Sequence, residues 1–157
     1  MRWAVLEALY ESEASGHDAE TAFNRRLREL ADDDGELLEH APKSFGLGML
    51  RGVLARKREF DDRIARAAPR FPVASMAIVD RNILRLAIWE LVTHTSAPTG
   101  AVVNEAVELA RRYGGERTPG FVNGVLRTIA EDVAAAQAGD GTPQEPEIPN
   151  PTQQENP

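Results

Sequence analysis

Apolar residues recur every three or four positions along most of this chain, which is the spacing of one face of an α-helix. No stretch shows the alternation of β-branched and polar residues that is typical of a half-buried strand. The pattern therefore predicts an all-α fold of seven helices joined by short loops. The predicted helices span about 2–13, 18–30, 43–53, 57–67, 79–93, 100–113 and 119–133.

Local signals support individual helix boundaries. Asp18 is a suitable N-cap, because its carboxylate accepts a backbone N–H of the first helical turn. Thr118 followed by Pro119 fits the start of the last helix, since proline is favoured at the first helical position. The glycines of segment 46–52 do not fit a phosphate-binding loop, because no strand precedes them and no Lys-Ser/Thr pair follows. Small residues that let helices pack closely are the favoured interpretation.

The predicted helix 79–93 is apolar on nearly every side, which is typical of a helix at the centre of a bundle. One carboxylate, that of Glu90, falls inside its apolar stripe. An unpaired carboxylate would be costly there. We therefore expect Glu90 to have hydrogen-bond partners from the start of a neighbouring helix, and we favour an architectural role for it over a chemical one.

Two prolines, Pro69 and Pro72, separate the predicted helices into two halves. The last twenty residues hold five of the ten prolines and a single large aliphatic residue, Ile148. Such a segment buries too little apolar surface to offset its ordering entropy, so we predict that it is disordered. The predicted parts are a helical domain over 1–137, with subdomains of about 1–70 and 73–137, and an acidic tail over 138–157.

The net charge of −7 at first argues against a nucleic-acid partner. The charge is unevenly distributed, however, because four of the excess negative charges lie in the tail 138–157. Segment 51–70 carries seven basic and three acidic residues, which leaves four excess positive charges. Two interpretations stay open for that segment, an ordinary solvated helix surface and a patch that faces RNA or a partner.

The composition excludes several kinds of site. The chain has no cysteine, which excludes disulfides, thiolate metal sites and a cysteine nucleophile. Its histidines, His17, His40 and His94, have no metal-ligand spacing, and no nucleophile elbow is present. No apolar run approaches the ~20 residues of a membrane span, and no signal-peptide pattern follows Met1. We predict a cytoplasmic protein that is not an enzyme and has no cofactor or metal.

Three motifs in the second half resemble motifs of the NusB family, in the same order and at matching gaps. They are VDRNILRLAIWEL at 79–91, VNEAVELA at 103–110 and FVNGVL at 121–126. The similarity is strong over 73–130 and weaker but continuous over 1–72, where AVLEALY at 4–10 resembles the first helix of the family. Three motifs in order are far more specific than any one of them.

The resemblance implies an all-helical RNA-binding protein with two subdomains. Members of the NusB family pair with a ribosomal protein that doubles as the factor NusE. The pair binds the single-stranded boxA element of ribosomal RNA leader transcripts and joins NusA, NusG and RNA polymerase, so that transcription runs through terminators. We therefore expect boxA RNA, NusE and this polymerase complex as partners, and a homodimer also stays open.

The resemblance also implies site residues. Tyr10 and Phe121 correspond to RNA contacts, in keeping with the stacking of unpaired bases on aromatic rings, although a core position is the alternative for each. Asn123 follows Phe121 on another side of the same predicted helix and is a further RNA candidate. Asp80 corresponds to the acidic position near the RNA and NusE surface, and Asp80 and Arg81 are the predicted contacts to NusE.

The chain departs from the family at its N-terminus. Family members usually begin with an arginine-rich stretch that supplies phosphate contacts, and only Arg2 matches that stretch here. Fewer cationic contacts weaken counterion release, so a lower RNA affinity and a smaller salt slope are expected. Three explanations stay open: a true start upstream, RNA binding that depends on the partner, or compensation by other basic residues, namely Arg81, Arg111, Arg112 or Arg117.

Two other functions fit the same residues. NusB-like domains also occur at the front of RNA cytosine methyltransferases, so the chain is alternatively a severed RNA-binding domain of such an enzyme. It is also compatible with a protein-interaction module that has little RNA affinity of its own. RNA titration with and without the ribosomal partner discriminates the second alternative, and a methyl-transfer assay discriminates the first.

Overall fold

The structure is a computed structural model that describes residues 1–33, 43–93 and 96–139. Within these ranges it contains seven α-helices, one short 3₁₀ helix and no strand, which confirms the predicted all-α fold. The elements are α1 (Arg2–Ser15), α2 (Ala19–Asp33), α4 (Lys43–Ala55), α5 (Lys57–Ala67), η1 (Val73–Ser75), α6 (Ile78–Val92), α7 (Thr99–Tyr113) and α8 (Thr118–Gly139).

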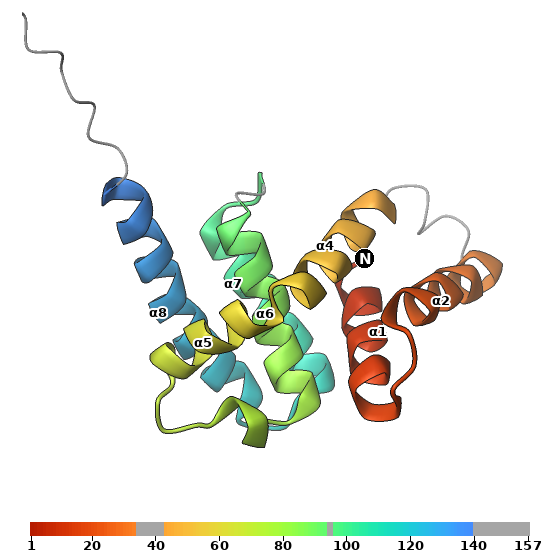
Figure 1. Cartoon of the computed structure of the whole chain (residues 1–157), viewed down its shortest axis with the longest axis horizontal. Helices are drawn as coiled ribbons and strands as arrows, with labels where there is room; N and C mark the ends of the chain where they lie inside the picture. Colours follow the sequence, from red (N-terminus) through yellow and green to blue (C-terminus); the bar gives the residue numbers. More distant parts are fainter. Residues whose placement is uncertain (34–42, 94–95, 140–157) are drawn as a thin grey trace, which may run out of the picture.

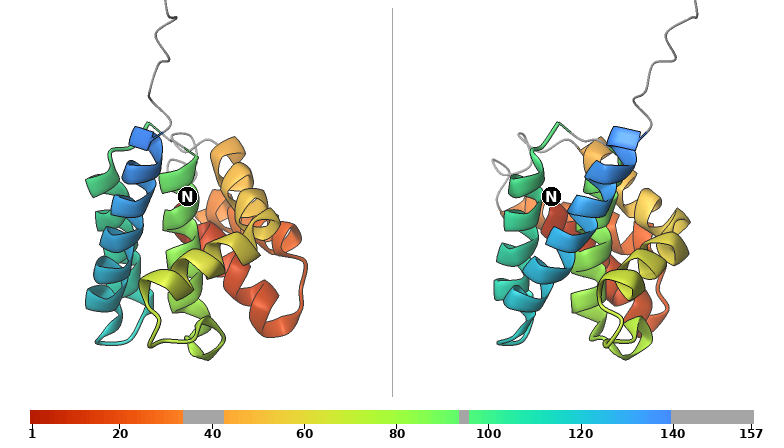
Figure 2. Two further views of the ribbon diagram at one scale, coloured as in Figure 1. Left: turned by 60° about the vertical axis from the view of Figure 1, so that its left-hand side comes forward. Right: turned by 90° about the vertical axis from the view of Figure 1, so that its left-hand side faces the viewer.

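Helix α6 lies at the centre of the bundle. It contacts α1, α4, α5, α7 and α8, and Figures 1 and 2 show it between α1 on one side and α7 with α8 on the other. Nine of its fifteen residues are buried. The helix that is apolar on nearly every side is thus the one that other helices surround, as the sequence pattern predicts.

The buried side chains form one connected cluster with members from all seven α-helices of the described ranges. Its largest fully buried side chains include Phe23 of α2, Phe60 of α5 and Ile129 of α8. Residues on both sides of Pro69 and Pro72 therefore share one core. The division into subdomains of about 1–70 and 73–137 stays a prediction that rests on the two prolines.

The predicted helix ends agree closely with the observed ones, with one correction. The Asp18 carboxylate accepts the backbone N–H of Thr21 at 2.8 Å, which confirms the predicted N-cap. Helix α8 continues to Gly139, so Ala138 and Gly139 are helical and the predicted tail boundary was two residues early. The reason is that alanine-rich sequence before Gly139 has high helix propensity and extends the last turns. The rest of the predicted tail, 140–157, lies outside the described residues.

Two glycines of α4 allow this helix to approach its neighbours closely. A Cβ atom on Gly52 would lie 1.9 Å from Nε1 of Trp89, and one on Gly46 would lie 2.6 Å from Cζ of Phe23. A Cβ atom on Gly48 would meet nothing within 4 Å. The packing interpretation of segment 46–52 is therefore confirmed for Gly46 and Gly52.

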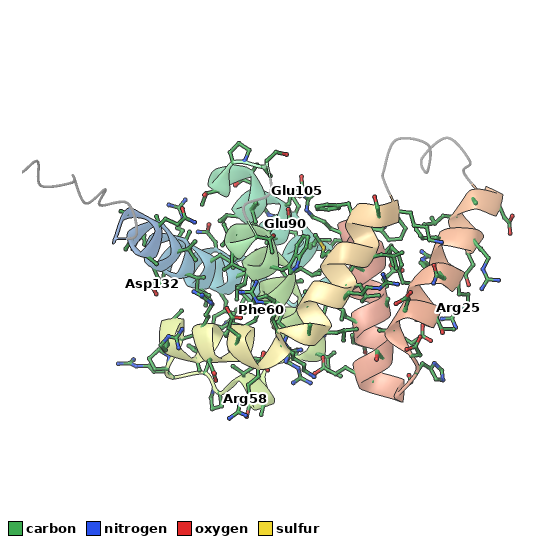
Figure 3. The ribbon with its side chains drawn as sticks, turned by 45° about the horizontal axis from the view of Figure 1, so that its top comes forward. Arg25, Arg58, Phe60, Glu90, Glu105 and Asp132 are labelled. Carbon is green, nitrogen blue, oxygen red and sulfur yellow. The ribbon has the colours of Figure 1, made fainter. Side chains whose placement is uncertain are left out.

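The buried carboxylate of Glu90 has the partner that the sequence requires. Arg2, at the start of α1, donates from Nε and Nη2 to the two carboxylate oxygens at 2.6 and 2.7 Å. Figure 3 shows Glu90 in the interior of the bundle. The predicted partner is confirmed, since it comes from the start of a neighbouring helix, and the architectural role of Glu90 stays a prediction.

Candidate nucleic-acid interface

Four helix ends meet on one side of the bundle, along the lower edge in Figure 1, where α1 and α7 end and α6 and α8 begin. Two pockets open there. The first, of about 440 Å³, lies between the segment before α6 and the start of α8, and we call it the Asp80 pocket. The second, of about 540 Å³, lies between α1, α6 and α7, and we call it the Tyr10 pocket. Ala77 lines both pockets, so they adjoin.

Both candidate aromatic residues face these pockets. Tyr10 lines the Tyr10 pocket and is 48% exposed. Phe121 is half-buried, lines the Asp80 pocket and packs edge-to-face against Phe71, with ring centroids 5.1 Å apart. Neither ring is sealed in the core, so both are accessible to a stacking partner. Their contact with RNA stays a prediction.

Asp80 lies on the first turn of α6 and lines the Asp80 pocket, opposite the start of α8. Its carboxylate accepts the hydroxyl hydrogen bond of Thr118 at 3.2 and 3.3 Å, which links the start of α6 to the start of α8. Burial raises the pKa of Asp80, and the Thr118 hydrogen bond opposes this shift only partly. The half-buried carboxylate is a hydrogen-bond acceptor on the wall of its pocket.

Arg81 does not point outward as a partner contact would. Its Nε donates to Glu13 at 3.0 Å and its Nη1 donates to the carbonyl oxygen of Met76 at 3.0 Å, which leaves 15% of the side chain exposed. Arg81 therefore holds the loop before α6 against α1. The sequence offered no signal for this contact, because Glu13 lies 68 positions away.

Sequence reasoning missed the charge cluster around Glu13. This carboxylate accepts from Asn82 at 2.7 Å and from the buried Arg85 at 3.2 Å, and Arg85 also donates to Asp61 at 2.7 and 2.9 Å. Burial alone would raise the pKa of Glu13, but hydrogen bonds from Asn82 and Arg81 and nearby positive charges lower it to about 2. The cluster ties the end of α1 to α6 and so positions Tyr10 beside its pocket.

Arg2 and Asn123 are not brought to the two pockets. Arg2 lies at the opposite end of α1 from Tyr10, with its guanidinium bonded to Glu90. Asn123 lies on another side of α8 from Phe121 and accepts a hydrogen bond from Arg127 at 3.3 Å. Both predicted RNA contacts therefore stand apart from the surface that carries the aromatic rings.

Among the four other basic residues that the sequence offers as candidate phosphate contacts, Arg117 has the suitable position. It is exposed, lines the Asp80 pocket and has no ion-pair partner among the described residues. Arg111 pairs with Glu108. The guanidinium of Arg112 lies over the ring of Tyr113, with Cζ 5.3 Å from the ring centroid. Arg117 is therefore the cation of this set that is free to meet a phosphate.

The basic segment 51–70 divides into paired and unpaired side chains. Arg51 pairs with Glu20, whereas Arg56 and Arg63 share Glu59. Within the described ranges, three exposed arginines of this segment have no ion-pair partner. They are Arg58, which Figure 3 shows on the outer side of α5, together with Arg66 and Arg70.

The part of the chain that the structure describes offers no metal centre, since it has no group of three His, Asp or Glu side chains that would hold an ion. In the same ranges, each helix is too short or too polar to span a bilayer.

Comparisons with known proteins agree on one family. The profile of the NusB family matches residues 1–131. A transcription antitermination protein NusB of Dehalococcoides mccartyi is 37% identical over 133 residues, which cover 85% of this chain and 89% of that protein.

The structure of T. maritima NusB matches with a TM-score of 0.73 and 31% identity, over 88% of this chain and 94% of that one. A structure of the antitermination factors NusB and NusE in complex with double-stranded RNA shares the fold, with a TM-score of 0.66 and 24% identity over 83% of this chain and 93% of that chain. With a match that covers most of its length, this chain belongs to the NusB family.

Proposed function

We propose that this chain is a non-catalytic transcription antitermination factor that binds boxA RNA together with the ribosomal protein NusE. Membership of the NusB family and the name of its relatives support antitermination as the role. The observation that carries RNA binding is the pair of adjoining pockets, where the exposed Tyr10 and the half-buried Phe121 flank Asp80 beside the unpaired Arg117.

The chemistry of this surface suits unpaired ribonucleotides. Flipped-out bases stack on aromatic rings, and Tyr10 and Phe121 present such rings at the two pockets. The Asp80 carboxylate accepts hydrogen bonds from donors on a base or on the partner protein. The Arg117 guanidinium forms strong hydrogen bonds with a phosphate.

In this proposal Arg2 and Arg81 act on the fold and not on the ligand, because their guanidinium groups are occupied by Glu90 and Glu13. Of the two residues predicted to contact NusE, Asp80 is the one kept in this proposal, because it lines a pocket and Arg81 does not. Asn123 is not part of the proposed RNA-binding surface, because it lines neither the Asp80 pocket nor the Tyr10 pocket.

The charge balance makes the partner important. The chain carries a net charge of −7, and its aromatic surface has few free cations to neutralise phosphates. Since phosphate contacts supply much of the affinity for nucleic acid, RNA binding by the isolated chain is expected to be weak. Pairing with NusE adds binding surface, and the pair then joins RNA polymerase with NusA and NusG.

Titration of a fluorescently labelled boxA RNA tests the proposal. Anisotropy is measured with the chain alone and with NusE, at two salt concentrations, and a scrambled RNA is the control. Tighter binding of boxA in the presence of NusE supports the proposal. Binding that ignores the sequence, or that is absent even with NusE, contradicts it and favours a protein-interaction module. Sedimentation of the same samples reports whether the free chain forms a homodimer.

A further inference from the structure

A third pocket, of about 370 Å³, lies between the end of α5 and α8, and we call it the Phe71 pocket. Phe71 and Phe121 line both this pocket and the Asp80 pocket, so their two rings form the wall between them. The floor is made by small residues, Ala67 and Ala68 on one side and Gly120 and Gly124 on the other. A side chain on Gly120 or Gly124 would meet nothing within 4 Å of its Cβ atom, which leaves open space above α8.

Phe71 is exposed to an unusual degree for its size. At 55% it is the most exposed large apolar side chain of the described residues, ahead of Tyr10 at 48%. One part of its ring contacts Phe121, and the rest faces solvent. Exposed apolar area contributes little to folding stability, so a binding partner is the better reason for an aromatic ring at this position.

The backbone presents this ring rigidly. Phe71 is followed by Pro72 and lies two positions after Pro69, and proline fixes the φ angle of its own residue. The backbone N–H of Phe71 donates to the carbonyl oxygen of Ala68 at 3.0 Å, which closes a tight turn after α5. Little conformational entropy is therefore lost when a ligand packs against this turn.

Two free cations border the pair of rings. Arg70 lines the Phe71 pocket and Arg117 lines the Asp80 pocket, and neither has an ion-pair partner among the described residues. Their freedom contrasts with Arg51, Arg56 and Arg63 of the same basic segment, which pair with glutamates. Aromatic rings flanked by unpaired guanidinium groups are typical of surfaces that bind single-stranded nucleic acid.

We propose that the Phe71 pocket binds a further nucleotide of the RNA, with its base against Phe71 and its phosphate at Arg70. The RNA strand then crosses the wall formed by Phe71 and Phe121, and its nucleotides occupy both the Asp80 pocket and the Phe71 pocket. This inference rests on the proposed RNA-binding function and extends it from the positions at Tyr10 and Phe121 to the end of α5. It also supplies cationic contacts away from the N-terminus.

The test uses the full chain with NusE and a boxA RNA that has flanking nucleotides on both sides. Loss of a stacked base lowers affinity about 5- to 150-fold, and we expect a loss in this range for Phe71→Ala. Arg70→Gln should lower the magnitude of the salt slope by about 0.7, which is the value for one phosphate contact of a single strand. Gly124→Leu should also weaken binding, because its side chain fills the pocket.

A matched control accompanies the pocket-filling variant. Gly48 lies in the helix α4, and its Cβ position is as open as that of Gly124. Gly48→Leu therefore adds the same side chain elsewhere and should leave RNA affinity unchanged. Thermal unfolding of each variant confirms that it is folded.

Each outcome separates the inference from the proposed function. If the unmodified chain does not bind RNA even with NusE, the proposed function itself fails. If Phe121→Ala weakens binding while Phe71→Ala and Gly124→Leu do not, the function stands and the Phe71 pocket is overturned. If a poly-glutamate peptide displaces the RNA and loses its own binding in Arg70→Gln and Phe71→Ala, the surface binds acidic peptides, which also overturns the inference.

Discussion

The guanidinium of Arg2 and the carboxylate of Glu90 form two hydrogen bonds, of 2.6 and 2.7 Å, between residues 88 positions apart. Glu90 is almost fully buried, and Arg2 is the basic residue that the family resemblance assigns to RNA. In this chain the pair joins the start of α1 to the end of the central helix α6. The pairing of Glu13 with Asn82 joins their other ends, so the two helices are antiparallel and held in register.

The first prediction concerns this pair. Arg2→Met should lower the free energy of unfolding by about 3 kcal/mol, because it leaves a buried carboxylate without its partner. The double variant Arg2→Met with Glu90→Met should regain most of that loss, since apolar residues of similar size replace both charges. Denaturant titration measures both. RNA affinity of the folded Arg2→Met variant should equal that of the unmodified chain, and a large loss would show that Arg2 contacts RNA after all.

The second prediction concerns the pH dependence of stability. The pKa of Glu13 is about 2 in the folded chain against an ordinary value of 4.5. Because the folded-state pKa is the lower one, the stabilisation is fully present above about pH 4.5 and is lost as the pH falls toward 2. Glu13→Gln should therefore cost about 2 kcal/mol at pH 7, as expected for hydrogen bonds to charged groups. The difference from the unmodified chain should shrink between pH 4.5 and 2, and a difference that is independent of pH would contradict the assignment.

The third prediction concerns the aromatic rings of the site. Phe121→Ala and Tyr10→Ala should each weaken boxA binding by about 1–3 kcal/mol in the presence of NusE, which is the value of one stacked base. Both side chains are partly exposed, so the variants should stay folded, as circular dichroism will check. Phe60→Ala, in the core, is the contrasting case and should destabilise the fold. Unfolding by Phe121→Ala would instead assign that ring to the core.

The fourth prediction concerns the close approach of α4 to α6. Gly52→Ala should destabilise the chain by about 1–3 kcal/mol, because the added methyl group would overlap the indole of Trp89. Gly48→Ala, on the same helix, meets no neighbour and should be neutral or stabilising by about 1 kcal/mol, since alanine favours helices more than glycine. Thermal unfolding of the two variants compares them directly, and equal effects would argue against the close contact.

Much of the fold was predictable because the helices depend on local signals. The apolar periodicity places helices within a few residues of their observed ends, and the Asp18 cap follows from one carboxylate at a helix start. The same local logic explains the one error at the boundary of α8. The alanines before Gly139 show no apolar periodicity, so the pattern does not predict a helix there. Their intrinsic helix propensity nevertheless extends α8 to Gly139.

The candidate site was predictable in part. The motifs point to Tyr10, Asp80 and Phe121, and the structure brings these three to two adjoining pockets. The motifs do not reveal that Arg81 is occupied by Glu13, nor that Phe71 stands exposed against Phe121. Such facts depend on which residues from distant segments lie opposite one another.

By itself, the sequence determined that the described part of the chain has an all-α fold, that helix 79–93 is central and that Glu90 requires a hydrogen-bond partner. Each of these follows from local spacing or from the cost of a buried charge. Tertiary structure alone decided that the partner is Arg2, that Glu13 holds Arg81 and Arg85, and that Phe71 is left on the surface. The physical reason is that periodicity identifies the apolar face of each helix but not the neighbouring helix that covers it. Whether a given side chain is used in packing or is left free to bind a ligand depends on that neighbouring helix.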